Sequence, residues 1–262
     1  MPHDDDLRLA HVLADDADSL TMQRFRALDL AVETKSDDTP VTDVDRAVEN
    51  AVRRTLSRAR SRDAIVGEEF GATGHGPRRW VIDPIDGTKS YLRGVPVWAT
   101  LIGLMVEDEV VAGVVSAPAL GRRWWAARGS GAWCGRSLTS AARCRVSAVA
   151  GLHHASLSYS SLGGWESVGR LDRFLELVRT CWRSRGYGDF WSYVLVAEGA
   201  VDVAAEPELA LHDMAAVSVI VEEAGGRFTD LDGKDGPLGA NAVATNGLLH
   251  DEVLSLLTPS PR

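Results

Sequence analysis

The hydrophobic positions of this chain change their spacing along its length, and the changes predict where helices and strands lie. Residues 7–30 carry apolar side chains at helical spacing and are predicted to form a long first helix. A second helix is predicted to begin after Thr42 and to run to about Ala59, with Asp45 in the capping-box position. The polar segment between these helices, residues 33–42, is predicted to be an exposed loop.

Short apolar runs bounded by turn residues predict a group of strands in the next part of the chain. Residues 64–66 and 79–82 are predicted to be short strands. Three longer runs follow, separated by charged or glycine-containing turns, and they predict an antiparallel meander at 97–106, 110–116 and 122–127. Residues 129–147 are predicted to contain turns and short strands.

Beyond about residue 150, helical and strand-like segments alternate. The predicted helices are 168–178, 189–197, 212–224 and 248–257, with Asp189 as the N-cap of the second. The predicted strands are 155–157, 181–185, 201–204, 227–229 and 242–244. There are no repeats or linkers, so we expect a mixed α+β (α/β) protein in which residues 1–262 form a single unit. Its N-terminal α+β subdomain is expected over about 1–150 and its C-terminal α/β subdomain over about 151–257.

Composition and charge narrow the class of protein. The chain has 262 residues, of which 45% are hydrophobic and 25% are charged, as is typical of a globular protein with a large core. The formal net charge is −9, without a long basic run, which argues against a nucleic-acid partner. The three cysteines are irregularly spaced, so they predict neither a disulfide framework nor a zinc site. An acidic N-terminus and the lack of a long apolar run predict a cytoplasmic protein with no membrane partner.

The segment 80–88, Trp-Val-Ile-Asp-Pro-Ile-Asp-Gly-Thr, carries the most specific chemistry. An apolar run leads into Asp83 and Asp86, and Pro84 stiffens the chain between them. Gly87 lets a backbone come close to a ligand. Two carboxylates beside exposed amides suit magnesium with a phosphate. The same residue types also form ordinary solvated turns, so this segment alone does not define a metal site.

Three further acidic clusters lie in similar contexts, and they shift the balance toward a metal site. Asp43 and Asp45 open the second predicted helix, Glu68 and Glu69 follow a strand, and Asp213 begins a mostly apolar helix. Each has a plain alternative role: Asp45 can cap its helix, Glu68–Glu69 can be a solvated turn, and Asp213 can complement a helix dipole. Taken together, the four clusters predict a site for two or three Mg²⁺ ions.

These motifs, in this order, resemble the inositol monophosphatase family of magnesium-dependent, lithium-sensitive phosphatases. The matching segments are 39–45 (Thr-Pro-Val-Thr-Asp-Val-Asp), 67–69 (Gly-Glu-Glu), 80–88, 212–216 (His-Asp-Met-Ala-Ala) and 223–226 (Glu-Ala-Gly-Gly), within a similarity that runs from about residue 7 to 257. The resemblance implies a layered αβαβα sandwich of the inositol monophosphatase and fructose bisphosphatase type. It also implies a small-molecule phosphate ester as substrate and a homodimer.

The resemblance implies a role for each motif residue. The implied metal ligands are Glu68, Asp83, the carbonyl of Ile85, Asp86 and Asp213. Asp45 and Thr88, with Glu68, are implied to position and activate the attacking water, and Gly87 and Thr88 to bind phosphate through their amides. Two Mg²⁺ ions about 3.5–4 Å apart can clamp the attacking and leaving oxygens of an in-line displacement. The family usually has Trp where this chain has His212, and we interpret that difference as a packing change rather than an added titratable group.

Within the family, the chain resembles the histidinol-phosphate phosphatase branch. The cues are segments 86–89, 93–98, 116–119, 123–127, 187–190 and 195–202, followed by Glu206-Pro207. Histidinol phosphate carries an ammonium group and an imidazole, and carboxylates at Asp189 and Glu206 could pair with them. Asp86 and Asp213 are placed with the substrate-binding residues too. The expected enzyme is therefore a phosphoric monoester hydrolase, a histidinol-phosphatase of histidine biosynthesis.

Other interpretations stay open at this point. Asp189 can serve as a helix cap, and Glu206 can be a surface carboxylate. The substrate can instead be inositol 1-phosphate, a broad range of sugar phosphates, phosphoadenosine phosphate or fructose bisphosphate. A metal-binding protein without catalytic activity is disfavoured, because no implied ligand and neither member of the Asp45–Thr88 pair is missing.

Overall fold

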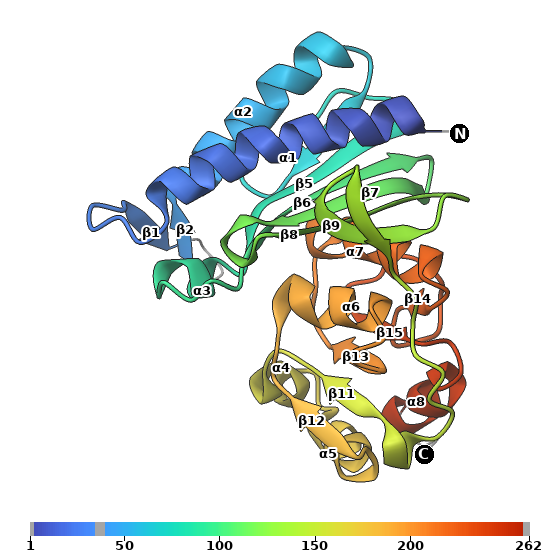
Figure 1. Ribbon diagram of the computed structural model, residues 1–262. Coiled ribbons are helices and arrows are strands. Elements are labelled where there is room, and N and C mark those ends of the chain that lie inside the picture. Colours follow the sequence, from blue (N-terminus) through green and yellow to red (C-terminus); the bar gives the residue numbers. More distant parts are fainter. Residues whose placement is uncertain (1–2, 35–39, 259–262) are drawn as a thin grey trace.

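The computed structural model describes residues 3–34 and 40–258 and has the layered αβαβα arrangement expected from the sequence (Figure 1). The layers, in order, are a pair of helices, an eight-stranded sheet, a second pair of helices, a five-stranded sheet, and a group of outer helices. Within the described residues, no helix is long and apolar enough to cross a membrane.

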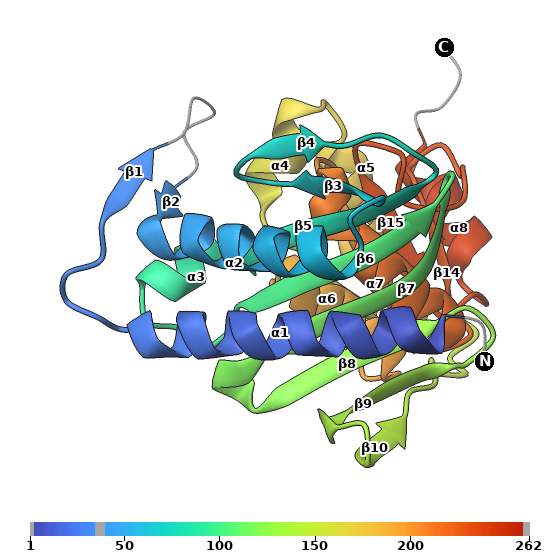
Figure 2. The same ribbon diagram turned by 90° about the horizontal axis from the view of Figure 1, so that it is seen from above.

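The eight-stranded sheet has the order β10-β9-β8-β7-β6-β5-β3-β4. Its strands are β3 (Ala64–Gly67), β4 (Gly71–Thr73), β5 (Arg78–Asp86), β6 (Ala99–Val106), β7 (Glu109–Ala117), β8 (Arg122–Ala127), β9 (Ala132–Ser137) and β10 (Ser140–Arg143). Within this sheet only β3 and β5 run parallel. Strands β6, β7 and β8 pair antiparallel in succession, which confirms the predicted meander. Helices α1 (Asp4–Arg24) and α2 (Asp43–Ala59) cover the outer face of this sheet (Figure 2).

The five-stranded sheet has the order β12-β11-β13-β15-β14. Its strands are β11 (Ser156–Ser158), β12 (Arg183–Arg185), β13 (Val203–Glu206), β14 (Arg227–Thr229) and β15 (Ala242–Thr245). The helices between the two sheets are α6 (Asp189–Ala197) and α7 (Leu211–Glu223). The outer helices are α4 (Leu162–Ser167), α5 (Leu171–Thr180) and α8 (His250–Leu257). The remaining helices are the short α3 (Thr88–Leu92), η1 (Pro118–Leu120) and η2 (Leu152–His154).

Three apolar clusters fill the spaces between the layers. The first packs α1 and α2 on the eight-stranded sheet and includes Leu13, Val48 and Trp80. The second lies between the two sheets around α6 and α7, and the third lies between the five-stranded sheet and the outer helices. Burial of apolar area in these layers is the main force that holds the helices on the sheets.

Helix α7 lies unusually close to the eight-stranded sheet because two glycines face it. Gly103 of β6 and Gly113 of β7 are direct cross-strand partners. A Cβ atom at Gly113 would lie 2.6 Å from the carbonyl oxygen of Ala216, and one at Gly103 would lie 2.9 Å from Ala215 Cβ. No side chain larger than hydrogen fits at either position, so the glycines set the distance between α7 and the sheet.

Several predicted boundaries are wrong, for identifiable reasons. The first helix ends at Arg24 rather than near residue 30, because the Phe25 ring packs against Tyr91 and Trp98, each with a centroid distance of 5.4 Å. The predicted helix 168–178 corresponds to α5, which begins only at Leu171 because the chain turns at Gly169, which has a φ of +68°. The short helix α4 before this turn was not predicted.

The segment predicted as a loop at residues 33–42 is ordered at both ends. Strand β1 (Val32–Thr34) pairs antiparallel with β2 (Pro40–Thr42), while residues 35–39 lie outside the described residues. The predicted capping box of the second helix is confirmed, since Thr42 and Asp45 bond each other reciprocally. The other predicted helices and strands are present, those at 122–127, 189–197 and 227–229 with the predicted bounds and the rest with shifted ends.

Candidate active site

A bulge in β5 brings the two aspartates of the 80–88 segment together. The register with β6 pairs Asp83 with Leu101 and then Asp86 with Ala99, so two residues of β5 lie opposite Thr100 alone. Thr100 Oγ1 donates a hydrogen bond of 2.8 Å to the carbonyl of Pro84 inside the bulge. In a regular strand, residues three apart point to opposite faces, and the extra residue of a bulge corrects this. Asp83 and Asp86 therefore point to the same side, from a bulged strand rather than the predicted turn.

The third aspartate of the cluster comes from the first turn of α7. Asp213 Oδ2 accepts a hydrogen bond of 2.7 Å from the Ala210 amide, which fixes the carboxylate at the start of the helix. One carboxylate oxygen from each of Asp83, Asp86 and Asp213 lies within 4.8 Å of the others. Because glycines hold α7 against the sheet, these carboxylates are brought together by the packing of α7 on β5 and β6.

The side chains of Asp83 and Asp86 are buried and that of Asp213 is half-buried, and the three carboxylates repel one another. This environment indicates whether a cation fits. Asp83 is only 2% exposed, and its Oδ1 atom is buried without a hydrogen-bond partner among the described residues. Burial, followed by the neighbouring charges of Glu68, Asp86 and Asp213, raises the pKa of Asp83 well above its usual value. Burial raises the pKa of Asp86 as well, with Asp189 and Asp213 adding to the effect. Hard oxygen donors under this repulsion fit a divalent cation such as Mg²⁺.

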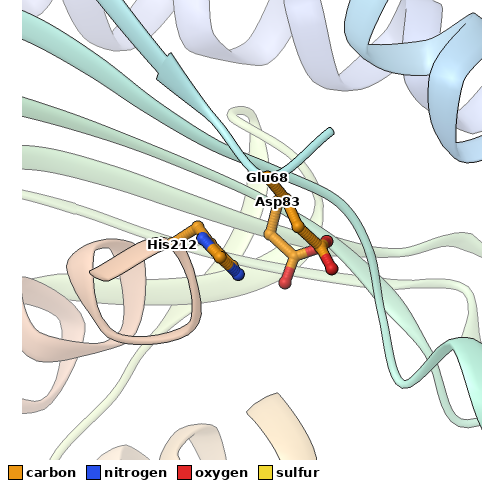
Figure 3. Close-up of side chains that lie close together, drawn as sticks. All are labelled: Glu68, Asp83 and His212. Atoms are coloured by element: carbon orange, nitrogen blue, oxygen red, sulfur yellow. The ribbon is translucent and has the colours of Figure 1, made fainter. Parts of the chain in front are cut away.

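Glu68 lies just beyond β3, with its amide donating a 3.2 Å hydrogen bond to the carbonyl of Ile82 on the parallel neighbour β5. A second group of possible metal ligands consists of Glu68, Asp83 and His212, again with one donor atom each within 4.8 Å of the others (Figure 3). Asp83 belongs to both groups. The His212 ring points toward the carboxylates of Glu68 and Asp83, and its Nε2 atom lies 3.6 Å from Asp213 Oδ1.

The turn that carries Glu68 is held by Glu49, a residue that the sequence analysis did not select. Glu49 is fully buried on α2 and accepts hydrogen bonds from the amides of Glu69 (2.7 Å) and Phe70 (3.2 Å) and from Arg53 Nε (2.7 Å). A Cβ atom at Gly67 would lie 2.0 Å from Glu49 Oε1, so only glycine allows this approach. The only signal in the sequence is the (i, i+4) spacing of Glu49 and Arg53, which is common on helices.

Replacing Glu49 with alanine is therefore expected to weaken metal binding without touching a metal ligand. The amides of Glu69 and Phe70 and the Arg53 guanidinium lose their acceptor, which should lower the free energy of unfolding by about 3 kcal/mol. Loss of an outer support of this kind typically weakens metal affinity by about 10–100-fold. Denaturant unfolding and calorimetric titration with Mg²⁺ measure the two effects. Glu176→Ala, which breaks an exposed glutamate–arginine pair on α5, is the control. Equal Mg²⁺ affinity in both variants would refute this role for Glu49.

Thr88 lines the cavity beside the acidic cluster, and Asp45 lies close enough to Glu68 and Glu69 for their charges to act on it. Asp45 Oδ2 accepts hydrogen bonds from the Thr42 amide (2.8 Å) and hydroxyl (2.5 Å), while Thr88 Oγ1 donates to the carbonyl of Ile85 (2.8 Å). Burial raises the pKa of Asp45 to about 6, against the lowering effect of its bonds to Thr42. Asp45 thus serves as a helix cap in this structure, and its pKa also suits proton transfer near neutral pH.

Two adjoining cavities open beside the carboxylates. The larger, of about 930 Å³, is lined by the acidic cluster together with Gly87, Thr88, Lys89 and His212. The smaller, of about 260 Å³, is lined by Ser160, Tyr193 and Glu206, among others. Asp86, Asp189 and Asp213 line both cavities. The larger cavity therefore contains the acidic cluster, and the smaller one adjoins it through three shared carboxylates and offers space for an organic group.

Asp189 sits between the two cavities in a conformation that few side chains adopt. Its φ is +50°, a left-handed value that Asp and Asn tolerate better than most residues. A Cβ atom at Gly87 would lie 3.2 Å from Asp189 Oδ2, so the carboxylate lies directly beside the turn that follows Asp86. The predicted N-cap role is wrong, because Gly188 occupies the cap position and no side chain caps the helix. Burial raises the pKa of Asp189 to about 6, with Asp213 adding to the effect and Lys89 opposing it.

Glu206 is buried at the end of β13 and not on a surface loop. It is 5% exposed, its Oε2 atom accepts a 2.5 Å hydrogen bond from Ser160 Oγ, and its Oε1 atom has no partner among the described residues. Burial raises the pKa of Glu206 to about 8, against the lowering effect of Ser160. A buried carboxyl group with a free acceptor atom is suited to a cationic or hydrogen-bond-donating ligand.

A sequence model of the inositol monophosphatase family matches residues 4–261. The chain belongs to the inositol monophosphatase family. An inositol monophosphatase from Zymomonas mobilis has the same fold, with a TM-score of 0.87 at 30% identity, over 98% of this chain and 99% of that one. The αβαβα layers are therefore those of the family.

Two relatives are much more similar in sequence. The chain is 65% identical to a histidinol-phosphatase of Streptomyces coelicolor, over 97% of both proteins. It is 60% identical to a histidinol-phosphatase of Mycobacterium tuberculosis, over 98% of this chain and 99% of the relative.

Proposed function

We propose that this protein is a metal-dependent phosphomonoesterase that hydrolyses L-histidinol phosphate to L-histidinol and phosphate. The choice of substrate rests on one observation: the chain is at least 60% identical to two histidinol-phosphatases over nearly its full length. The cavities support the same choice, since they place two carboxyl groups beside the acidic cluster. The proposal includes a cytoplasmic homodimer that acts in histidine biosynthesis, in keeping with the family resemblance.

The acidic cluster is proposed to hold the metal ions. Glu68, Asp83, Asp86, Asp213 and the carbonyl of Ile85 are the proposed ligands, for two or three Mg²⁺ ions. When bound, these ions would neutralise the phosphate and acidify the attacking water. No covalent enzyme nucleophile is required, because phosphoryl transfer depends mainly on positioning and charge neutralisation.

The remaining residues of the larger cavity are proposed to bind and orient the substrate. Gly87 and Thr88 line this cavity at the start of α3, and their amides are proposed to donate hydrogen bonds to the phosphate oxygens. Asp45, ionised near neutral pH, is proposed to accept a proton from the attacking water together with Thr88. The bonds of Asp45 to Thr42 fix the orientation of its carboxylate before the substrate binds.

Asp189 and Glu206 are proposed to select the organic part of the substrate. Histidinol carries an ammonium group and an imidazole, and both can donate hydrogen bonds to carboxylates. A cation that enters the smaller cavity would favour ionisation of Glu206 and offset the cost of burying its charge. A neutral polyol gains less from two carboxylates in this position, so the arrangement favours histidinol over inositol.

Removing divalent metal is expected to abolish phosphate release from L-histidinol phosphate. The buried carboxylates cannot neutralise a phosphate dianion without cations, so the protein dialysed against EDTA should be inactive. Added Mg²⁺ should restore the full rate in a saturable manner, whereas added K⁺ at equal ionic strength should not. A chelated enzyme that retains its rate would contradict the proposed metal dependence.

A further inference from the structure

The acidic cluster offers oxygen donors, whereas His212 beside it offers a ring nitrogen. His212 lies in the first turn of α7, directly before Asp213, and its side chain is 22% exposed. Its ring points toward the carboxylates of Glu68 and Asp83 (Figure 3), and one ring nitrogen lies within 4.8 Å of an oxygen of each. The packing interpretation made from the sequence does not explain this orientation, because the ring lines the larger cavity.

A hydrogen bond to the neighbouring Asp213 does not explain the position of the His212 ring. Its Nε2 atom is 3.6 Å from Asp213 Oδ1, which is longer than an ordinary hydrogen bond. Asp213 Oδ2 is already taken by the Ala210 amide. Asp83 contributes a carboxylate oxygen to the same group of donors, and its Oδ1 atom is buried without a hydrogen-bond partner among the described residues. The His212 imidazole therefore lies beside a carboxylate group that has one unsatisfied oxygen.

We infer that His212 is a nitrogen ligand, so that the metal position at Glu68, Asp83 and His212 differs in metal preference from the position at Asp83, Asp86 and Asp213. The first position offers two carboxylates and an imidazole, whereas the second offers carboxylates alone. Carboxylates suit Mg²⁺, Ca²⁺ and Mn²⁺ alike, whereas imidazole suits first-row transition metals, a class that includes Mn²⁺ but not Mg²⁺. The first position is expected to prefer Mn²⁺ to Mg²⁺, and the second to discriminate less between the two ions.

This inference rests on the metal site proposed above but requires no substrate. Mn²⁺ is the probe, because it resembles Mg²⁺ in its ligand demands and its coordinated nitrogen can be detected directly by electron spin-echo spectroscopy. With one equivalent of Mn²⁺, the wild-type protein is expected to show ¹⁴N modulation from a bound imidazole. His212→Asn is expected to lose this signal, and His75→Asn, which changes an exposed histidine elsewhere, is expected to keep it.

Affinity gives a second readout that a purely structural role of His212 would not produce. Calorimetric titration of His212→Asn is expected to show an Mn²⁺ affinity about tenfold weaker than wild type, with Mg²⁺ affinity changed less than about twofold. An equal loss for both metals would overturn the inference. So would a wild-type Mn²⁺ complex without ¹⁴N modulation, a result that does not depend on whether the variant folds. If Mn²⁺ does not bind at all, the proposed metal site itself fails, and the two failures are thereby distinguished.

Discussion

Replacing Asp86 with asparagine is expected to abolish turnover while leaving the fold intact. Asp86 Oδ2 accepts a 2.5 Å hydrogen bond from the Phe190 amide, and the oxygen of an asparagine side chain can keep that bond. The substitution removes one negative charge from the cluster, and with it a ligand for the cations that would stabilise the transition state. A loss of about 4 kcal/mol in that stabilisation corresponds to a rate about 1,000-fold lower. Steady-state phosphate release at saturating Mg²⁺ measures the effect.

The control for Asp86→Asn is a buried aspartate with similar hydrogen bonds but no contact with the cavities. Asp202 is 6% exposed, and its Oδ2 atom accepts a 2.6 Å hydrogen bond from the Ser156 amide. Asp202→Asn should lower the thermal midpoint with little change in kcat, whereas Asp86→Asn should lower kcat with little change in the midpoint. Activity of Asp86→Asn close to that of wild type with added Mg²⁺ would refute the assignment of Asp86 as a ligand.

The second large effect is expected when Asp189 is replaced, and the loss of kcat/KM should depend on which substrate is used. Asp189→Ala should lower kcat/KM for L-histidinol phosphate by about 30–100-fold, because a charge-assisted hydrogen bond contributes about 2–3 kcal/mol. The same variant should change kcat/KM for p-nitrophenyl phosphate by less than about threefold, since an aryl group carries no cation for the carboxylate to bind. The ratio of the two losses is the quantity that tests substrate recognition.

Asp189→Asn separates charge from backbone conformation. The residue has a φ of +50°, so alanine introduces strain in addition to removing the carboxylate, whereas asparagine tolerates this conformation. Both variants should lose histidinol phosphate turnover selectively if the charge is responsible. Suppose that Asp189→Ala lowers kcat/KM equally for both substrates and that Asp189→Asn lowers it for neither. Asp189 would then shape the start of α6 and take no part in selecting the substrate.

Much of the site could be predicted from the sequence because its residues lie in short motifs. The 80–88 segment and the Glu68 and Asp213 clusters each pair an acidic residue with a strand end or a helix start, and the structure brings them together. The local conformation of Asp83 and Asp86 could not be predicted in the same way. Their shared direction depends on a bulge that exists only through the pairing of β5 with β6.

The residues whose roles could not be predicted from the sequence act through tertiary contacts. Glu49 is one acidic residue on an amphipathic helix, and nothing local indicates that it accepts hydrogen bonds from a turn twenty residues away. Phe25 ends the first helix early because of aromatic partners at 91 and 98. His212 looks like a tolerated substitution until the packing of α7 places its ring beside Glu68 and Asp83. In each case the deciding partner is distant in the sequence.

The measurement that tests the central claim most directly is magnesium-dependent phosphate release from L-histidinol phosphate and from inositol 1-phosphate, side by side with one preparation of the protein. The account predicts a strong preference in kcat/KM for L-histidinol phosphate, and a loss of that preference in Asp189→Asn. Equal rates on the two substrates, or a preference for inositol 1-phosphate, would contradict the substrate assignment while leaving the metal chemistry in place.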